Sequence, residues 1–125
     1  MKFYEVQERL NGVIEFINKG ITLPIKVSYA INKTRKALIE EAKTFEEERT
    51  KLIHLYAEKD ESGEYIVEDG NYKIIPEHAT DFSKGYNDLL NLEVDVQITQ
   101  FSIEDLNGFN LSVLDLDRLD FMIKE

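Results

Sequence analysis

Apolar residues recur at helical spacing from Leu23 to Glu58, and this pattern predicts one long helix. Pro24 suits the first helical position, and no Pro or Gly follows it before Gly63. At about 1.5 Å per residue, the helix would extend roughly 54 Å. Four of its apolar residues are spaced seven positions apart and form a heptad seam: Ile31, Leu38, Phe45 and Leu52. We expect other elements, or a second copy of the chain, to cover this seam.

A shorter amphipathic helix is predicted for residues 3–19, and Gly20 is expected to end it. Its apolar residues follow the i, i+4, i+7 pattern and are expected to face inward: Val6, Leu10, Val13, Ile14 and Ile17. The short turn after Gly20 would make this helix and the long one an αα-hairpin.

The dipeptide Asp69-Gly70 lies between two apolar stretches and is a strong signal for a two-residue β-hairpin turn. The predicted strands are Glu64–Val67 and Tyr72–Ile75. If Asp69 and Gly70 are the loop residues, the facing pairs are Val67 with Tyr72 and Tyr65 with Ile74.

The region after the hairpin combines a helical pattern with a strand pattern. Residues 79–91 have the apolar spacing of a helix, although Gly85 should cost it about 1 kcal/mol relative to Ala. Leu92–Thr99 alternates between apolar and polar residues and predicts a strand with one buried face. We expect this strand to join the hairpin in a small three-stranded antiparallel sheet at one end of a helical bundle.

The C-terminal part repeats the pattern apolar-Ser-apolar-x-Asp-Leu, first at 101–106 and again at 111–116. Ser102 and Ser112 are expected to cap two helical segments, the second running from about Val113 to Ile123. The predicted fold is α+β and mostly helical, in a single domain over residues 1–125.

Charge divides the chain into two unequal halves. Residues 1–59 hold 11 Lys/Arg and 9 Asp/Glu, whereas residues 60–125 hold 4 and 16, so the balances are +2 and −12. An acidic half repels nucleic-acid phosphates and anionic membranes, which argues against binding to either. It suits either solubility or a basic partner. The carboxylates that we assign to such a partner surface are Glu64, Glu68, Asp69, Glu93 and Asp95.

Few residue patterns in the chain point to chemistry. Cysteine is absent, and neither His54 nor His78 has a second metal ligand at helical spacing. Glycine does not form a phosphate-binding loop, and no serine has the context of a nucleophile. We therefore expect a protein that is not an enzyme and that holds no metal or cofactor.

The composition also bears on the compartment. No apolar stretch approaches the length of a membrane span, and the first residues lack the apolar core of a signal peptide. A cytoplasmic protein is the simplest expectation.

The order of the predicted elements resembles a loose set of small bacteriophage and prophage proteins of unknown function from Gram-positive hosts. The residues that carry the resemblance are Arg49, Leu52-Ile53, Tyr56 through Gly63, Tyr72-Lys73-Ile74, Phe82 and Leu89 through Val96. The resemblance covers about half of the chain and implies a structural, assembly or host-directed accessory protein, in the cytoplasm of the host cell.

Three functional hypotheses follow from these patterns. The first is a non-enzymatic factor that binds another protein. The second is an inhibitor of a host nucleic-acid-handling enzyme, such as a nuclease, that presents its carboxylates to a basic surface. The third is a protein that sequesters a small ligand such as a nucleotide. The heptad seam also predicts a homodimer, with the long helices packed together near residues 37–45.

Overall fold

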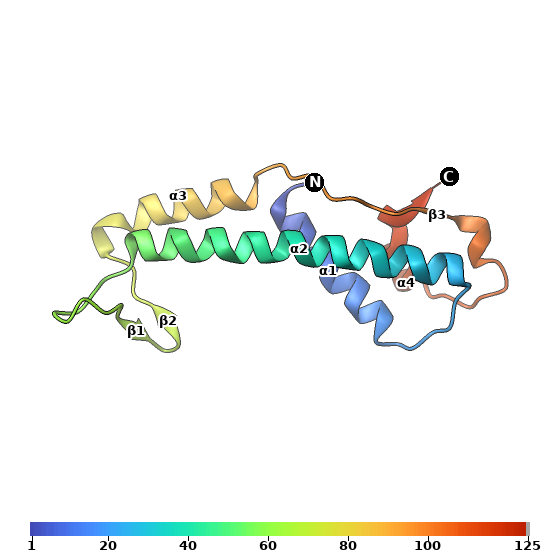
Figure 1. Cartoon of the computed structure of the whole chain (residues 1–125), viewed down its shortest axis with the longest axis horizontal. Helices are drawn as coiled ribbons and strands as arrows, with labels where there is room; N and C mark the ends of the chain where they lie inside the picture. The colour runs from blue at the N-terminus through green and yellow to red at the C-terminus, as the bar shows by residue number, and fades with distance from the viewer. Residues whose placement is uncertain (125) are drawn as a thin grey trace.

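The computed structural model describes residues 1–124, and one long helix forms the axis of the molecule (Figure 1). This helix, α2, spans Ile25–Tyr56 and contains 32 residues. It begins directly after Pro24, whose φ of −54° suits a helix start, and it ends where Ala57 adopts an extended conformation. The predicted long helix is therefore confirmed, with ends about two residues inside the predicted ones.

Two shorter helices cover different parts of α2. Helix α1, Phe3–Ile17, crosses it in the middle, and helix α3, Ala79–Leu90, lies along its C-terminal half (Figure 1). The ring of Phe45 lies between the two covering helices. Its centroid is 5.4 Å from that of Phe3 and 6.3 Å from that of Tyr86.

The inward face of α1 differs from the predicted one. Phe3, Val6, Val13 and Phe16 are buried, whereas Ile14 and Ile17 are 38% and 40% exposed. The prediction that Ile14 and Ile17 face inward is wrong. At 100° per residue Ile17 lies on the same side of α1 as Val6 and Val13, and Ile14 lies at the edge of that side, so their exposure means that this end of the buried face is incompletely covered.

The β-hairpin forms with the predicted turn. Strands β1, Val67–Glu68, and β2, Asn71–Tyr72, are antiparallel, and Val67 pairs with Tyr72 as predicted. Tyr65 and Ile74 do not face each other. Their partners are Lys59 and Ala57, because the segment that leaves α2 runs between them and pairs with both.

The predicted three-stranded sheet is wrong, because the structure has two separate two-stranded sheets within residues 1–124. Strand β3, Phe101–Ser102, pairs in parallel with β4, Ile123–Lys124, away from the hairpin (Figure 1). The predicted strand Leu92–Thr99 does not form as a named strand. Within it, Leu92, Glu93 and Val94 pair through their backbone with residues 1–3, not with the hairpin. The alternation of this stretch does predict burial, since Val94, Val96 and Ile98 pack against the core.

The C-terminal part follows the two predicted serine caps. Ser102 caps the 3₁₀ helix η2, Ile103–Leu106, and Ser112 caps α4, Val113–Leu119. Each makes a reciprocal capping box with an aspartate three positions later. The final helix is shorter than predicted, since a 3₁₀ turn, η3, follows at Asp120–Met122. A third 3₁₀ turn, η1, Pro76–His78, leads into α3.

The main hydrophobic core lies where α1, the N-terminal half of α2 and the C-terminal segment meet. Its buried members are Val6, Val13, Phe16, Leu23, Val27, Ala30, Ile31, Leu38, Phe101, Leu106, Leu119 and Met122. The architecture is α+β and mostly helical, with one end of α2 in this core and the other end covered by α3 and the hairpin. Among residues 1–124, no helix combines the length and the apolar character needed to cross a membrane.

Candidate functional site

The five carboxylates assigned to a partner surface lie in two places. Glu64, Glu68 and Asp69 belong to the hairpin, which lies below α2 in Figure 1, whereas the segment that carries Glu93 and Asp95 runs above it. Two of them are partly neutralised, since Glu68 lies 3.7 Å from the Lys73 ammonium and Glu93 lies 3.4 Å from the N-terminal ammonium. The structure therefore does not bring the five together as one surface.

Asp95 has acidic neighbours that the sequence pattern did not indicate. It lies with Glu40 and Glu41 at a hollow of about 350 Å³ beside α2. Within residues 1–124, no three His, Asp or Glu side chains are placed to hold a metal ion.

The heptad seam is packed within the chain itself. Ile31, Leu38 and Phe45 are buried, and Leu52 is half-buried against Gly85 of α3. These residues thus offer little free apolar surface to a second copy of α2. Whether the chain associates with itself through another surface stays a prediction.

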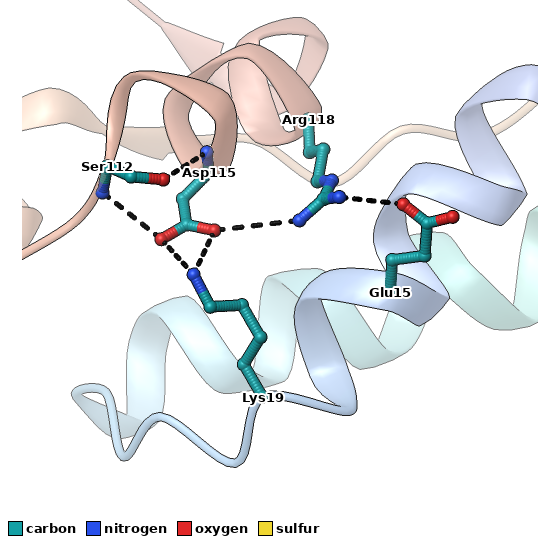
Figure 2. Close-up of polar contacts among 5 residues, drawn as sticks. All are labelled: Glu15, Lys19, Ser112, Asp115 and Arg118. Atoms are coloured by element: carbon teal, nitrogen blue, oxygen red, sulfur yellow. Dashed lines mark hydrogen bonds and ion pairs between the residues drawn. The ribbon is translucent and has the colours of Figure 1, made fainter.

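Asp115 is 1% exposed and joins α4 to the end of α1 (Figure 2). Its two carboxylate oxygens accept hydrogen bonds from the Lys19 ammonium at 2.7 and 2.8 Å, and one also accepts from the Ser112 backbone N–H. Arg118 lies 3.7 Å from the same carboxylate and donates to Glu15 of α1 at 2.7 Å. Two positive and two negative groups thus form a chain of contacts between the two helices, in the order Lys19, Asp115, Arg118 and Glu15.

The electrostatics of Asp115 indicate a structural role. The hydrogen bond from Lys19, followed by those from Ser112, holds the pKa of this carboxyl below its ordinary value of 3.8. The pKa of the Glu5 carboxyl is also lowered, because this carboxyl accepts a hydrogen bond from the backbone N–H of Lys2 in the capping box of α1. Both carboxylates are ionised at neutral pH and hold helix ends in place.

His54 and His78 lie apart from this network. His54 is half-buried, and its ring stacks on Tyr65 with centroids 4.4 Å apart. Its Nε2 atom is buried without a hydrogen-bond partner among the described residues. His78 is exposed and lies 3.8 Å from Asp81. The His54 ring contacts Tyr65 and Tyr72, whereas the His78 ring lies beside Tyr56.

An apolar groove lies between α1 and the N-terminal half of α2. Its volume is about 520 Å³. The residues that line it are Ile14, Phe16, Ile17, Asn18, Ile21, Leu23, Ser28, Ile31, Asn32 and Arg35. We call this hollow the α1–α2 groove. The charged residue in the lining of the α1–α2 groove is Arg35. Its guanidinium donates a hydrogen bond to the side-chain oxygen of Asn32 at 2.7 Å.

The α1–α2 groove exists because the C-terminal segment covers the opposite side of α1. Gly12, Glu15 and Lys19 meet Arg118 and Asp115 of α4. At 3.6 residues per turn, Ile14 and Ile17 point almost directly away from those three positions. α1 thus packs against both α4 and α2, and the groove lies beside its contact with α2.

A second hollow, of about 380 Å³, lies nearer the middle of α2. It is lined by Leu10, Ile39, Ala42, Lys43, Glu46 and Glu47. The α2 residues along both hollows follow alternating steps of three and four positions: Ser28, Asn32, Arg35, Ile39, Ala42 and Glu46. They share one face of α2, so the two hollows lie on the same side of the helix.

The sequence patterns missed this site, since they assigned Ile14 and Ile17 to the interior. A signal for it was available: from Phe16 to Ile39 the chain is rich in isoleucine and contains no Asp or Glu. Comparisons of the chain with protein-family models, with curated proteins and with solved structures found no match.

Proposed function

We propose that this chain is a small, acidic, non-enzymatic factor that binds another protein, and that the α1–α2 groove is its docking site. The observation that carries the proposal is the exposure of Ile14 and Ile17 within an apolar hollow of about 520 Å³. Contiguous apolar surface in a concave setting is typical of sites where proteins bind one another. An assembly or host-directed accessory role, of the kind that the resemblance to small phage proteins implies, fits such a binding protein.

A protein segment suits the groove better than a nucleotide does. Nucleotide sites hold phosphates with several cations or with backbone N–H groups at a helix N-terminus. Here the lining contributes one guanidinium, Arg35, which already donates to Asn32. Most of the lining is apolar, which is a feature of a groove that receives side chains from another chain.

The test is affinity capture from host or infected cells with the wild type and with an Ile14→Ser/Ile17→Ser variant. Both residues are exposed, so the variant should fold. The matched control is Leu55→Ser/Val113→Ser, which removes two exposed apolar side chains elsewhere, 69% and 87% exposed. A partner that the control retains and the groove variant loses supports the proposal. A partner retained by both variants, or turnover of a small molecule without a stable partner, contradicts it.

A second function, inhibition of a nucleic-acid-handling enzyme, draws on the loop and hairpin after α2. Between Lys59 and Lys73 the chain has no basic residue and carries five carboxylates, all exposed: Asp60, Glu61, Glu64, Glu68 and Asp69. Such a surface suits a basic channel. Reversal of Glu61, Glu64 and Asp69 to Lys should then abolish capture of a basic partner, and added salt should weaken that capture. Capture that is unaffected by both the charge reversal and the added salt would contradict this function.

A further inference from the structure

Residues 95–98 contain backbone groups that lie between two anchored positions. On one side, the N–H of Val94 donates to the carbonyl of Met1 at 2.8 Å, and the N-terminal ammonium donates to the carbonyl of Val94 at 3.0 Å. On the other side, the N–H and the carbonyl of Thr99 are both hydrogen-bonded to the Thr34 hydroxyl. Within residues 1–124, the N–H and C=O groups of residues 95–98 have no hydrogen-bond partner. We call these four residues the open segment.

The side chains of the open segment have the periodicity of a strand. Asp95 and Gln97 are exposed, whereas Val96 and Ile98 are half-buried and pack against the main core. This alternation is typical of β structure, in which the N–H and C=O groups point sideways toward a neighbouring strand. Figure 1 shows the segment running between the N-terminus and β3. The open segment therefore has the features of a strand edge without a neighbouring strand in the part of the chain that the structure describes.

Space for a second chain lies next to this edge. The hollow of about 350 Å³ is lined by all four residues of the open segment and by Ala37, Glu40 and Glu41 of α2. At 100° per residue, these three helix positions point in roughly the opposite direction from Asn32 and Arg35, which line the α1–α2 groove. The open segment is therefore a surface separate from the proposed docking groove.

Every charged residue in the lining of this hollow is acidic. The three are Glu40, Glu41 and Asp95, and none of them forms an ion pair among the described residues. Lys36 and Lys43 lie four and three positions from Glu40 along α2, but neither lines the hollow. The carboxylates oppose pairing with the same edge of a second copy, and they attract a strand that carries Lys or Arg.

We propose that the open segment binds a basic, extended segment of another protein by β-augmentation, the addition of a strand to an unpaired edge. The backbone of the added strand would exchange hydrogen bonds with the open segment. Its outward side chains would be Lys or Arg, near Glu40, Glu41 and Asp95, and apolar side chains between them would lie beside Val96. This binding does not depend on the proposed docking function of the α1–α2 groove.

The experiment titrates the wild-type protein with the capped peptide Lys-Val-Lys-Val-Lys-Val-Lys and follows backbone amides by NMR. We expect binding that slows hydrogen exchange of amides within residues 95–98, because their N–H groups gain acceptors. The same peptide with methylated amide nitrogens keeps every charge but loses its backbone donors. It should bind on the order of tenfold more weakly. A peptide with Glu in place of each Lys should not bind.

Protein variants test the role of the carboxylates. Glu40→Gln/Asp95→Asn should weaken binding of the unmethylated Lys peptide on the order of fivefold at low salt. The matched control Glu47→Gln/Asp117→Asn changes the net charge equally at exposed positions outside the hollow, and it should change binding less than about twofold. Ile14→Ser/Ile17→Ser should bind the peptide as the wild type does, which separates this proposal from the proposed function.

Other outcomes would overturn the proposal. Equal binding of the methylated and unmethylated peptides would show attraction by charge alone, and equal binding of the Glu peptide would remove the preference for a basic strand. No binding, or binding that leaves exchange within residues 95–98 unchanged, would show that the open segment is not the site. Amides there that become protected as the protein concentration rises, together with a dimer in sedimentation, would assign the edge to a second copy of this chain.

Discussion

At the scale of single residues, two buried polar side chains attach the C-terminal part of the chain to the first two helices. The Thr34 hydroxyl donates to the carbonyl of Thr99 and accepts from the N–H of the same residue. Asp115 accepts two hydrogen bonds from Lys19. Both contacts join residues more than sixty positions apart. They hold the C-terminal part of the chain against α2 and against the end of α1.

Thr34→Val should destabilise the protein by about 1–3 kcal/mol, because it leaves the N–H and C=O of Thr99 without their partner in the interior. The shape of the side chain is nearly unchanged, so lost packing contributes little. Urea unfolding followed by circular dichroism measures the effect. Thr50→Val, at an exposed position of the same helix, is the control and should differ from wild type by less than about 0.5 kcal/mol. Equal midpoints for the two variants would contradict this account of Thr34.

Asp115→Asn should change how stability depends on pH. The pKa of Asp115 is lowered in the folded protein, so its contribution is fully present above the ordinary value of 3.8 and is lost as the pH falls through the lowered value. The variant should thus be less stable than wild type at pH 6, and the gap should narrow toward pH 3. Urea midpoints at both pH values measure this, with the exposed Asp117→Asn as control. A gap that stays constant with pH would show that Lys19 does not act on an ionised Asp115.

At the scale of elements, α3 shows what the sequence pattern predicts and what it omits. Its extent was predicted to within a residue at either end, because apolar spacing depends on the helix alone. The close contact that Gly85 makes with α2 was not predicted. A Cβ atom at this position would lie 3.0 Å from a methyl carbon of Leu52, so the glycine allows α3 to approach α2 closely. Contacts between elements are set by partners that local periodicity does not identify.

Gly85→Leu should separate α3 from α2 and lower stability by about 1–3 kcal/mol, the usual cost of overpacking. This loss opposes the gain of about 1 kcal/mol that a better helix former brings. Ser83→Leu, at an exposed position of α3, adds the same side chain without the contact and should not lower stability. Thermal unfolding of the two variants makes the comparison. A Gly85→Leu variant as stable as Ser83→Leu would contradict the close packing.

In the other elements too, the sequence predicted features with local signals but not the contacts between elements. The Asp69-Gly70 turn and both serine caps were predicted because their signals are local, and the structure has all three. Alternation in residues 92–99 predicted burial but not which element they would pack on. For α1, the pattern predicted one inward face, and Val6 and Val13 of that face are buried. Ile14 and Ile17 stay partly exposed because their cover depends on how α1 packs against the other elements, which local periodicity does not specify.

At the scale of the whole molecule, the long axis connects two ends with different charge and different covering elements. One end holds the main core and residues 16–39, which carry five basic residues and no acidic one, and the other holds the acidic hairpin (Figure 1). The seam of α2 that predicted a homodimer is buried between α1 and α3 in the single chain. An interaction with another molecule therefore has to use surface outside that seam.

Phe45→Glu should unfold the protein or destabilise it by more than about 3 kcal/mol, because the new carboxylate would be buried beside the rings of Phe3 and Tyr86 without a partner. Sedimentation and urea unfolding, run on the same samples, separate this outcome from dimer dissociation. A wild-type dimer that Phe45→Glu converts into a folded, equally stable monomer would support the predicted packing of α2 on α2 instead.

The measurement that tests the docking groove most directly is photo-crosslinking from position 17. A photoreactive phenylalanine analogue replaces Ile17 in one sample and Val113, an exposed apolar residue outside the groove, in the other. After illumination in host or infected cells, we predict one discrete adduct with a partner protein from position 17 and no such adduct from position 113. Identical products from both positions, no adduct from position 17, or an adduct of two copies of this chain would contradict the account.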